Sequence, residues 1–312
     1  MASLPITKHV EVKKMNKKLL ATAVLAALTV STVSAFAAPV ISGDARILAQ
    51  KNDGEHTYID TRFRLNADAE LGDDIYAHGR IMGIDKQGPQ YGLNYAEAGT
   101  GLSGASINIE QMYIGAKIGM VDIKAGLQPV EVGHGLLADI NGIEGLSLAT
   151  TAGNVGAYGF AGRSGTDDVV AAQLNTTVEN INVGANFLKK ESTDYWSINA
   201  NTKVATNIKL AGEYVKNDTD NKDGYLVKAT VGEVAKKGDF NYAVSYRNID
   251  TGAVDAGWTK NGAFADSKGF RLEANYKVGT NANLNLYKDF VDQVSDTSIH
   301  PDQMRAELTV NF

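Results

Sequence analysis

The sequence predicts an all-β fold: a transmembrane antiparallel up-and-down β-barrel of about sixteen strands. Residues 58–71 alternate between apolar and polar side chains, and after a turn at residues 72–74 the alternation resumes through residue 84. Because successive side chains of a strand point to opposite faces, this hairpin has one apolar and one charged face. Its strands reach about ten residues, the length that crosses a membrane, whereas strands of soluble proteins average about five or six.

A soluble β-sandwich would show the same alternation, so the composition of the polar face decides between the two folds. Within residues 58–71 that face carries Arg62, Arg64 and three acidic side chains. Such a dense charged face fits a water-filled lumen, with the apolar face against lipid. The chain has 312 residues, a formal charge of −6 and no cysteine. Without a disulfide framework, we expect stability to come from closure of the sheet.

The first 37 residues predict a secretory signal peptide. Residues 15–18 form a basic n-region, residues 19–33 an apolar h-region, and Ala35-Phe36-Ala37 an A-x-A cleavage site. Residues 1–14 would be an upstream extension. We therefore expect the barrel domain to span residues 38–312 and to reside in the cell outer membrane.

Alternating segments continue along the rest of the chain, separated by seven short turns and eight longer loops, as in bacterial outer-membrane barrels. The pattern breaks near residues 108–113, and a β-bulge at Glu110 would reconcile its two halves. Aromatic residues near the strand ends predict two girdles at the lipid interfaces, at Trp196, Tyr214, Tyr225, Tyr246 and Phe270 on one side and at Phe240, Tyr276 and Phe312 on the other. We expect strands at residues 41–49, 58–71, 75–84, 107–117, 121–128, 143–150, 155–162, 169–178, 181–187, 196–200, 208–214, 225–231, 240–247, 270–277, 282–290 and 303–312.

Two segments resemble those of Gram-negative general porins. Residues 305–312, RAELTVNF, look like the C-terminal assembly signal of outer-membrane proteins, whose last Phe, here Phe312, is read by the barrel-assembly machinery. Residues 111–117, QMYIGAK, followed by residues 125–128, AGLQ, resemble the porin pattern in which Q-A-Y-V-G-L precedes G-R-Q. Leu127 replaces the Arg of that pattern, and the acidic Pro-Glu-Phe motif of the family is absent. The resemblance implies a homotrimeric diffusion channel in contact with outer-membrane lipid and lipopolysaccharide.

By the same resemblance, residues 129–142 would form a constriction loop that folds into the lumen after the fifth strand. Glu131 and Asp139 are its acidic side chains, and Glu144 lies just beyond it. These three carboxylates would form the acidic side of the constriction.

Strand alternation independently places four arginines on the inward face of the first three strands: Arg46, Arg62, Arg64 and Arg80. A basic wall facing the acidic loop would set a transverse field across a narrow pore with low-dielectric walls. In the alternative interpretation, the arginines pair across strands with neighbouring carboxylates, namely Asp44, Asp60 or Asp68.

Other chemistry has little support in the sequence, so we expect no enzyme activity, cofactor or metal. The histidines have no metal-binding spacing, and Ser147 with His134 is a possible nucleophile pair without a surrounding motif. Residues 217–223 resemble part of a calcium loop but lack its central Gly and final Glu, so a solvated outer loop is favoured. The chain is acidic and has no basic patch with interleaved aromatics, which argues against nucleic-acid binding.

The sequence therefore predicts an outer-membrane porin, a water-filled channel for the passive diffusion of small hydrophilic solutes and ions. The alternative is a structural or adhesive barrel whose loops at residues 85–105 and 249–268 bind a partner. An outer-membrane enzyme is a third possibility, disfavoured by the missing catalytic set.

Overall fold

The computed structural model describes residues 38–87, 105–259 and 265–312, which form sixteen antiparallel strands. The predicted signal peptide lies outside the described residues, as do most of loop 85–105 and part of loop 249–268. Within the described residues, no helix has the length and apolar character needed to cross a membrane. The strands are β1 (Val40–Asn52), β2 (Tyr58–Glu70), β3 (Ile75–Gln87), β4 (Ala105–Ile118), β5 (Val121–Val132), β6 (Ala138–Ala152), β7 (Val155–Ser164), β8 (Asp167–Val178), β9 (Ile181–Lys190), β10 (Thr193–Ala205), β11 (Ile208–Asn217), β12 (Lys222–Gly232), β13 (Phe240–Ile249), β14 (Ser267–Gly279), β15 (Ala282–Asp292) and β16 (Gln303–Asn311).

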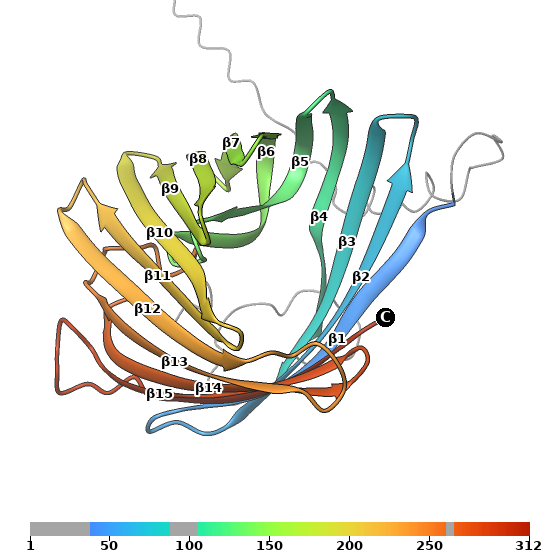
Figure 1. Ribbon diagram of the computed structural model, residues 1–312. Coiled ribbons are helices and arrows are strands. Elements are labelled where there is room, and N and C mark those ends of the chain that lie inside the picture. The colour runs from blue at the N-terminus through green and yellow to red at the C-terminus, as the bar shows by residue number, and fades with distance from the viewer. Residues whose placement is uncertain (1–37, 88–104, 260–264) are drawn as a thin grey trace, which may run out of the picture.

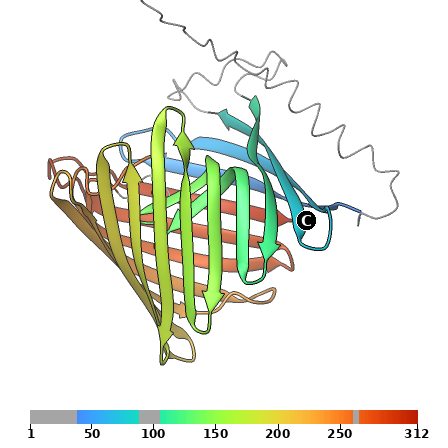
Figure 2. The same cartoon turned by 90° about the horizontal axis from the view of Figure 1, so that it is seen from above.

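A single sheet closes on itself because the last strand pairs with the first (Figure 1, Figure 2). In the β1–β16 register, Asp44 faces Asn311 and Asn52 faces Gln303. Just beyond β16, the N–H of Gly43 donates to the carbonyl of Phe312 at 2.9 Å, and the N–H of Phe312 donates back at 3.0 Å. Closure gives every strand two neighbours, which is how a sheet satisfies its backbone where lipid offers no hydrogen bonds.

The outer face of the barrel is apolar, as the alternation predicts. Ile47, Phe63 and Leu272 are 56%, 48% and 51% exposed. The side chains of Arg46 and Arg62, which point to the other face of the same strands, are only 13% and 15% exposed. Among the predicted girdle residues, the exposed side chains include Tyr225, Phe240, Phe270, Tyr276 and Phe312.

The β-bulge predicted at Glu110 is confirmed. Arg80 of β3 pairs with Gln111, while the next residue, Ile81, pairs with Ile109, so Glu110 has no residue opposite it in β3. One extra residue reverses the alternation along β4 and re-aims the local side chains. The Glu110 carboxylate is thereby directed toward the arginines of the inner face.

Connections differ from the expectation at two points. The links after β7 and β9 are two-residue turns at residues 165–166 and 191–192, where the predicted strands left longer connections at residues 163–168 and 188–195. Both turns contain a residue with positive φ, Gly165 at 65° and Glu191 at 53°, as tight hairpin turns require. Strand pairing continues to both turns, with Ser164 opposite Asp167 and Lys190 opposite Thr193.

We expect Gly43→Val to destabilise the closing seam. A Cβ at Gly43 would overlap the carbonyl oxygen of Arg64 and the ring of Phe312, which stacks on Phe63 at 5.5 Å. Overpacking of this kind costs about 1–3 kcal/mol. Urea titration of the refolded barrel in lipid, followed by tryptophan fluorescence, measures the loss.

Gly79→Val is the matched control, because a Cβ at Gly79 meets nothing within 4 Å. Equal unfolding midpoints for the two variants would contradict the role assigned to the Gly43–Phe312 contact.

Candidate functional site in the barrel lumen

The segment predicted to be a constriction loop is mostly strand. β5 and β6 continue as a paired hairpin through residues 130–132 and 138–140, and only residues 133–137 form the connection. The expectation of a loop over residues 129–142 is therefore corrected. Apolar residues at alternate positions, here Val130 and Val132, are typical of a strand, and the Gly-rich tip alone forms the turn.

This hairpin separates from the wall at a bend. β5 pairs with β4 only as far as Leu127, and the β5–β6 register shifts between Gln128 and Val130, around Pro129. Proline has no N–H to give to a ladder, so it occurs in strands at edges and bulges. On β6, a Cβ at Gly142 would overlap the carbonyl oxygen of Glu110, so the bend needs a glycine there. Figure 1 shows the hairpin leaving the line of neighbouring strands.

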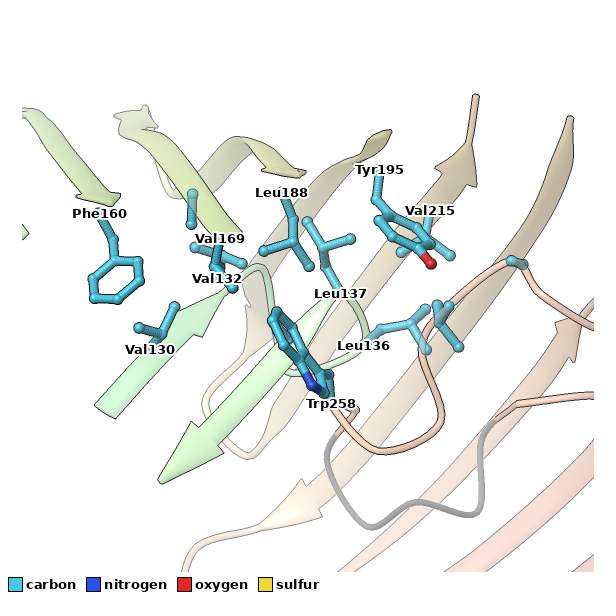
Figure 3. Packing of buried hydrophobic residues seen from close by; sticks show 14 of the residues in the cluster. Val130, Val132, Leu136, Leu137, Phe160, Val169, Leu188, Tyr195, Val215 and Trp258 are labelled. Atoms are coloured by element: carbon cyan, nitrogen blue, oxygen red, sulfur yellow. The ribbon is translucent and has the colours of Figure 1, made fainter. Parts of the chain in front are cut away.

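One face of the hairpin is apolar and packs on inward-facing side chains of β7–β11. Figure 3 shows Val130, Val132, Leu136 and Leu137 gathered with side chains from these strands. Trp258, from the loop after β13, covers the same cluster, and its carbonyl accepts a hydrogen bond from the N–H of Asp139 at 2.6 Å. The wall contributes fully or almost fully buried residues, namely Phe160, Val169, Ala171, Leu188, Tyr195 and Val215. Apolar side chains on the inner face of this wall are thus explained by the hairpin that covers them.

A buried carboxylate holds the tip of the hairpin. Glu213 of β11 is 3% exposed and accepts hydrogen bonds from the N–H groups of His134 at 2.9 Å and Leu136 at 3.1 Å. The hydroxyl of Ser197 donates to its other oxygen at 2.9 Å. Gly133 has a φ of 78°, and a Cβ there would overlap the carboxylate, so only glycine fits at this position.

Glu131 and Asp139, two of the predicted constriction acids, face each other across the hairpin. They lie on the face that does not enter the apolar cluster. Glu131 is exposed and borders a cavity of about 480 Å³ along the wall of β8–β10, together with His134 of the tip.

Glu144, the third predicted acid, is not part of the hairpin. It follows the bend, and it shares a face of β6 with Leu146 and Leu148, which are 48% and 47% exposed on the outside of the barrel. Its register partner on β7 is the exposed Arg163. The expectation that Glu144 belongs to the acidic side of the constriction is corrected, because the bend returns β6 to the wall with this side chain outward.

The four predicted arginines lie on the inner face of β1–β3, each bonded to a neighbouring polar group. The pairs are Arg46–Asp60 at 2.8 Å, Arg62–Asp44 at 2.8 Å, Arg64–Glu110 at 2.9 Å and Arg80–Asn66 at 2.6 Å. Cross-strand pairing, predicted as the alternative, is therefore confirmed for Asp44 and Asp60. Asp68 instead bonds to the imidazole of His78 at 2.7 Å.

Three further arginines extend this row on β13, β14 and β16. Arg271 makes a two-pronged contact with Asp289 at 2.6 and 2.7 Å, Arg247 lies 3.3 Å from the same carboxylate, and Arg305 bonds to Glu307. The alternation along each strand places all three on the inner face. Only the pairing of β16 with β1 shows that they continue the row formed by the other four arginines. We call these seven residues the arginine wall: Arg247, Arg271, Arg305, Arg46, Arg62, Arg64 and Arg80.

The structure separates the two residues that the sequence offered as a possible nucleophile pair, Ser147 and His134. The hydroxyl of Ser147 is buried and donates to Gln128 at 2.6 Å, whereas His134 Nε2 lies 3.2 Å from Asn201 Nδ2. The possible Ser147–His134 pair is thus not formed. Among residues 38–87, 105–259 and 265–312, no group of three or more His, Asp or Glu side chains could hold a metal ion.

We expect Glu213→Ala to release the hairpin tip. The N–H groups of His134 and Leu136 would lose their acceptor, and each group that is left unsatisfied in a buried position costs about 1–3 kcal/mol. Hydrogen exchange read by mass spectrometry on peptides that cover residues 130–140 should show faster exchange in this variant.

Glu273→Ala serves as the control, because Glu273 is an inner-face carboxylate that bonds to Lys228 at 2.7 Å and not to the hairpin. Unchanged protection of residues 130–140 in Glu213→Ala would show that the apolar cluster alone positions the hairpin.

Comparison with known proteins identifies the fold. No protein-family model and no curated protein matches the chain. Among solved structures, a mutant of the Rh. blastica porin is similar, with TM-score 0.60, 10% identity, and coverage of 88% of this chain and 100% of that one. A loop-deletion mutant of OmpT, an outer membrane protein of Vibrio cholerae, has TM-score 0.61, 12% identity and coverage of 88% and 99%. OprB of Pseudomonas putida has TM-score 0.60, 11% identity and coverage of 88% and 92%. Together with the closed sheet and its apolar outer face, these likenesses show the fold of a porin-like β-barrel of sixteen strands.

Proposed function

We propose that the chain is an outer-membrane porin that forms a water-filled channel for the passive diffusion of small hydrophilic solutes and ions. The observation that carries the proposal is the charged inner face of a closed barrel whose outer face is apolar. A barrel of sixteen strands is wide enough to leave an aqueous lumen. Charged side chains on the inner face fit such a lumen, because unpaired charges would be too costly in a dry interior.

The hairpin and the arginine wall would together set the selectivity of the channel. The hairpin would narrow the lumen, with Glu131 and Asp139 as its acidic groups. The ion pairs of the seven wall arginines involve five carboxylates, so positive charges outnumber negative ones within these pairs; the acids are Asp44, Asp60, Glu110, Asp289 and Glu307. Separated acidic and basic surfaces in a narrow pore would orient dipolar solutes and select ions.

The proposal extends to the partners that the porin resemblance implies. The exposed apolar face would contact outer-membrane lipid and lipopolysaccharide, and three copies would associate into a homotrimer. Phe312 would be read by the barrel-assembly machinery during insertion and would then pack on Gly43 in the folded barrel. Crosslinking of the refolded protein in lipid, followed by mass measurement, tests the trimer.

Reconstitution into planar lipid bilayers tests channel function directly. We expect discrete current steps from purified, folded protein, because an open aqueous lumen conducts salt. A folded barrel that produces no steps would contradict the proposal and would favour the structural or adhesive alternative. Turnover of an ester or peptide substrate by such a silent barrel would favour an enzyme.

Ion selectivity tests the arginine wall. We expect a double variant, Arg62→Ser with Arg80→Ser, to shift the reversal potential in a salt gradient toward cation preference. We expect this shift because the two substitutions remove two positive charges, whereas their partners Asp44 and Glu110 stay negative.

Arg163→Ser is the matched control, because Arg163 is 71% exposed in its side chain and pairs with Asp168 away from the lumen. A reversal potential that stays at the wild-type value in the double variant would remove the arginine wall from the selectivity mechanism.

A further inference from the structure

A second inner surface, distinct from the arginine wall, lines the cavity of about 480 Å³ beside the hairpin tip. Cavities of this size are in the range of small-molecule sites. Its wall consists of amide and hydroxyl side chains on β8, β9 and β10, with Glu131 and His134 of the hairpin on the other side. Among the described residues that line it, Glu131 is the one carboxylate and there is no Lys or Arg; the wall side chains are Gln173, Asn175, Thr177, Asn182, Asn199 and Asn201.

A glycine lies between two of the amides that line this cavity. Gly184 of β9 is the register partner of both Asn175 on β8 and Asn199 on β10. A Cβ at Gly184 would overlap the amide oxygens of both neighbours, which therefore lean over the glycine. The two amides can take these positions because residue 184 has no side chain.

A chain of hydrogen bonds across β8, β9 and β10 holds some of the lining side chains in place. The hydroxyl of Thr177 donates to Asn182 at 2.7 Å, and Asn182 donates to Asn201 at 3.0 Å. Asn201 Nδ2 lies 3.2 Å from His134 Nε2, which accepts when the imidazole is neutral. Burial lowers the pKa of His134, which favours that neutral form. This row joins the wall to the hairpin tip and fixes the rim of the cavity.

Other amides keep their hydrogen-bonding capacity. Within the described part of the chain, no hydrogen bond is formed by the side-chain amides of Gln173, Asn175 or Asn199. Each amide offers an oxygen acceptor and two N–H donors. A hydroxyl group is likewise donor and acceptor, so a ligand with several hydroxyls can satisfy these groups together.

The charges and the polarity of the lining narrow the ligand class. Glu131 disfavours anions, and the described lining offers no cationic partner for them. Apolar ligands would bury amides without partners, which is costly. A single carboxylate among neutral amides is a weak cation site compared with the multi-carboxylate sites of bound metal ions. Neutral polyhydroxylated molecules fit all three conditions.

We propose that this amide-lined cavity binds neutral polyhydroxylated solutes, such as small saccharides, on their way through the lumen. The proposal rests on the channel function proposed above, and it adds a binding step to passive diffusion. Occupation of the cavity would reduce the ion current through the same lumen.

Sucrose added to a planar bilayer that contains the full-length protein tests the site. We expect the current to fall saturably with sucrose concentration, beyond the decrease caused by the lower bulk conductivity. In a double variant, Asn175→Ala with Asn199→Ala, about tenfold more sucrose should be needed, because several hydrogen bonds are lost. Gly184→Val should weaken the block in the same direction, because the new side chain would displace both amides.

Asn285→Ala is the matched control. Asn285 is an inner-face amide of β15 that bonds to Glu273 and Asn275, outside the cavity. It should leave the sucrose dependence unchanged; an equal loss in this variant, or block by spermidine without block by sucrose, would overturn the proposal.

Two failures remain distinguishable. Normal current steps with a decrease that only follows bulk conductivity would remove the saccharide site and leave the channel in place. A folded barrel without current steps would remove the channel, and titration calorimetry of sucrose into the detergent-solubilised protein would then decide the site. The saccharide site is supported if the wild-type chain releases heat on binding sucrose and the Asn175→Ala, Asn199→Ala variant does not. If the wild-type chain gives no heat of binding, the site is overturned.

Discussion

The structure depends on one constraint: every backbone N–H and C=O group of a strand in lipid must be paired within the sheet. The pairing of β16 with β1 satisfies this constraint where the sheet closes, and there Gly43 and Phe312 exchange two backbone hydrogen bonds. With the backbone satisfied, side chains alone distinguish the two faces. Apolar residues lie on the outer face of the barrel. Charged residues of the strands lie mainly on the inner face, where they form ion pairs or are solvated by water.

The inner face is divided by the hairpin of β5 and β6. Where the hairpin covers the wall, the inward residues of β7–β11 include a cluster of apolar side chains, such as Phe160 and Leu188. Where the wall is uncovered, it is charged on β13–β16 and β1–β3 and neutral but polar on β8–β10. The arginine wall would act at long range through its charge. Amides act only at hydrogen-bond distance, so the two surfaces would select different properties of the same solute.

The alternation predicted most of the fold, because a period of two is a local property of the sequence. It gave the inward position of Arg62 and Arg64, and its interruption located the bulge at Glu110. Local patterns could not reveal the bend at Pro129, because that bend depends on the packing of the hairpin against distant strands. Glu144 was therefore assigned to the wrong side. The sequence also could not predict that the amides of β8–β10 lie side by side. Their proximity depends on the register between strands, which the spacing of residues along the sequence does not determine.

Glu213 couples the hairpin to the amide surface. It is the register partner of Asn199, its carboxylate accepts the hydroxyl of Ser197, and the same group holds the N–H of His134. Gly133 and His134 border the cavity, so the position of the tip also fixes its opening. A buried carboxylate that satisfies two N–H groups is costly to move, because each would lose its acceptor. The width of the lumen and the shape of the amide-lined cavity would therefore both depend on the contact between Glu213 and the hairpin tip.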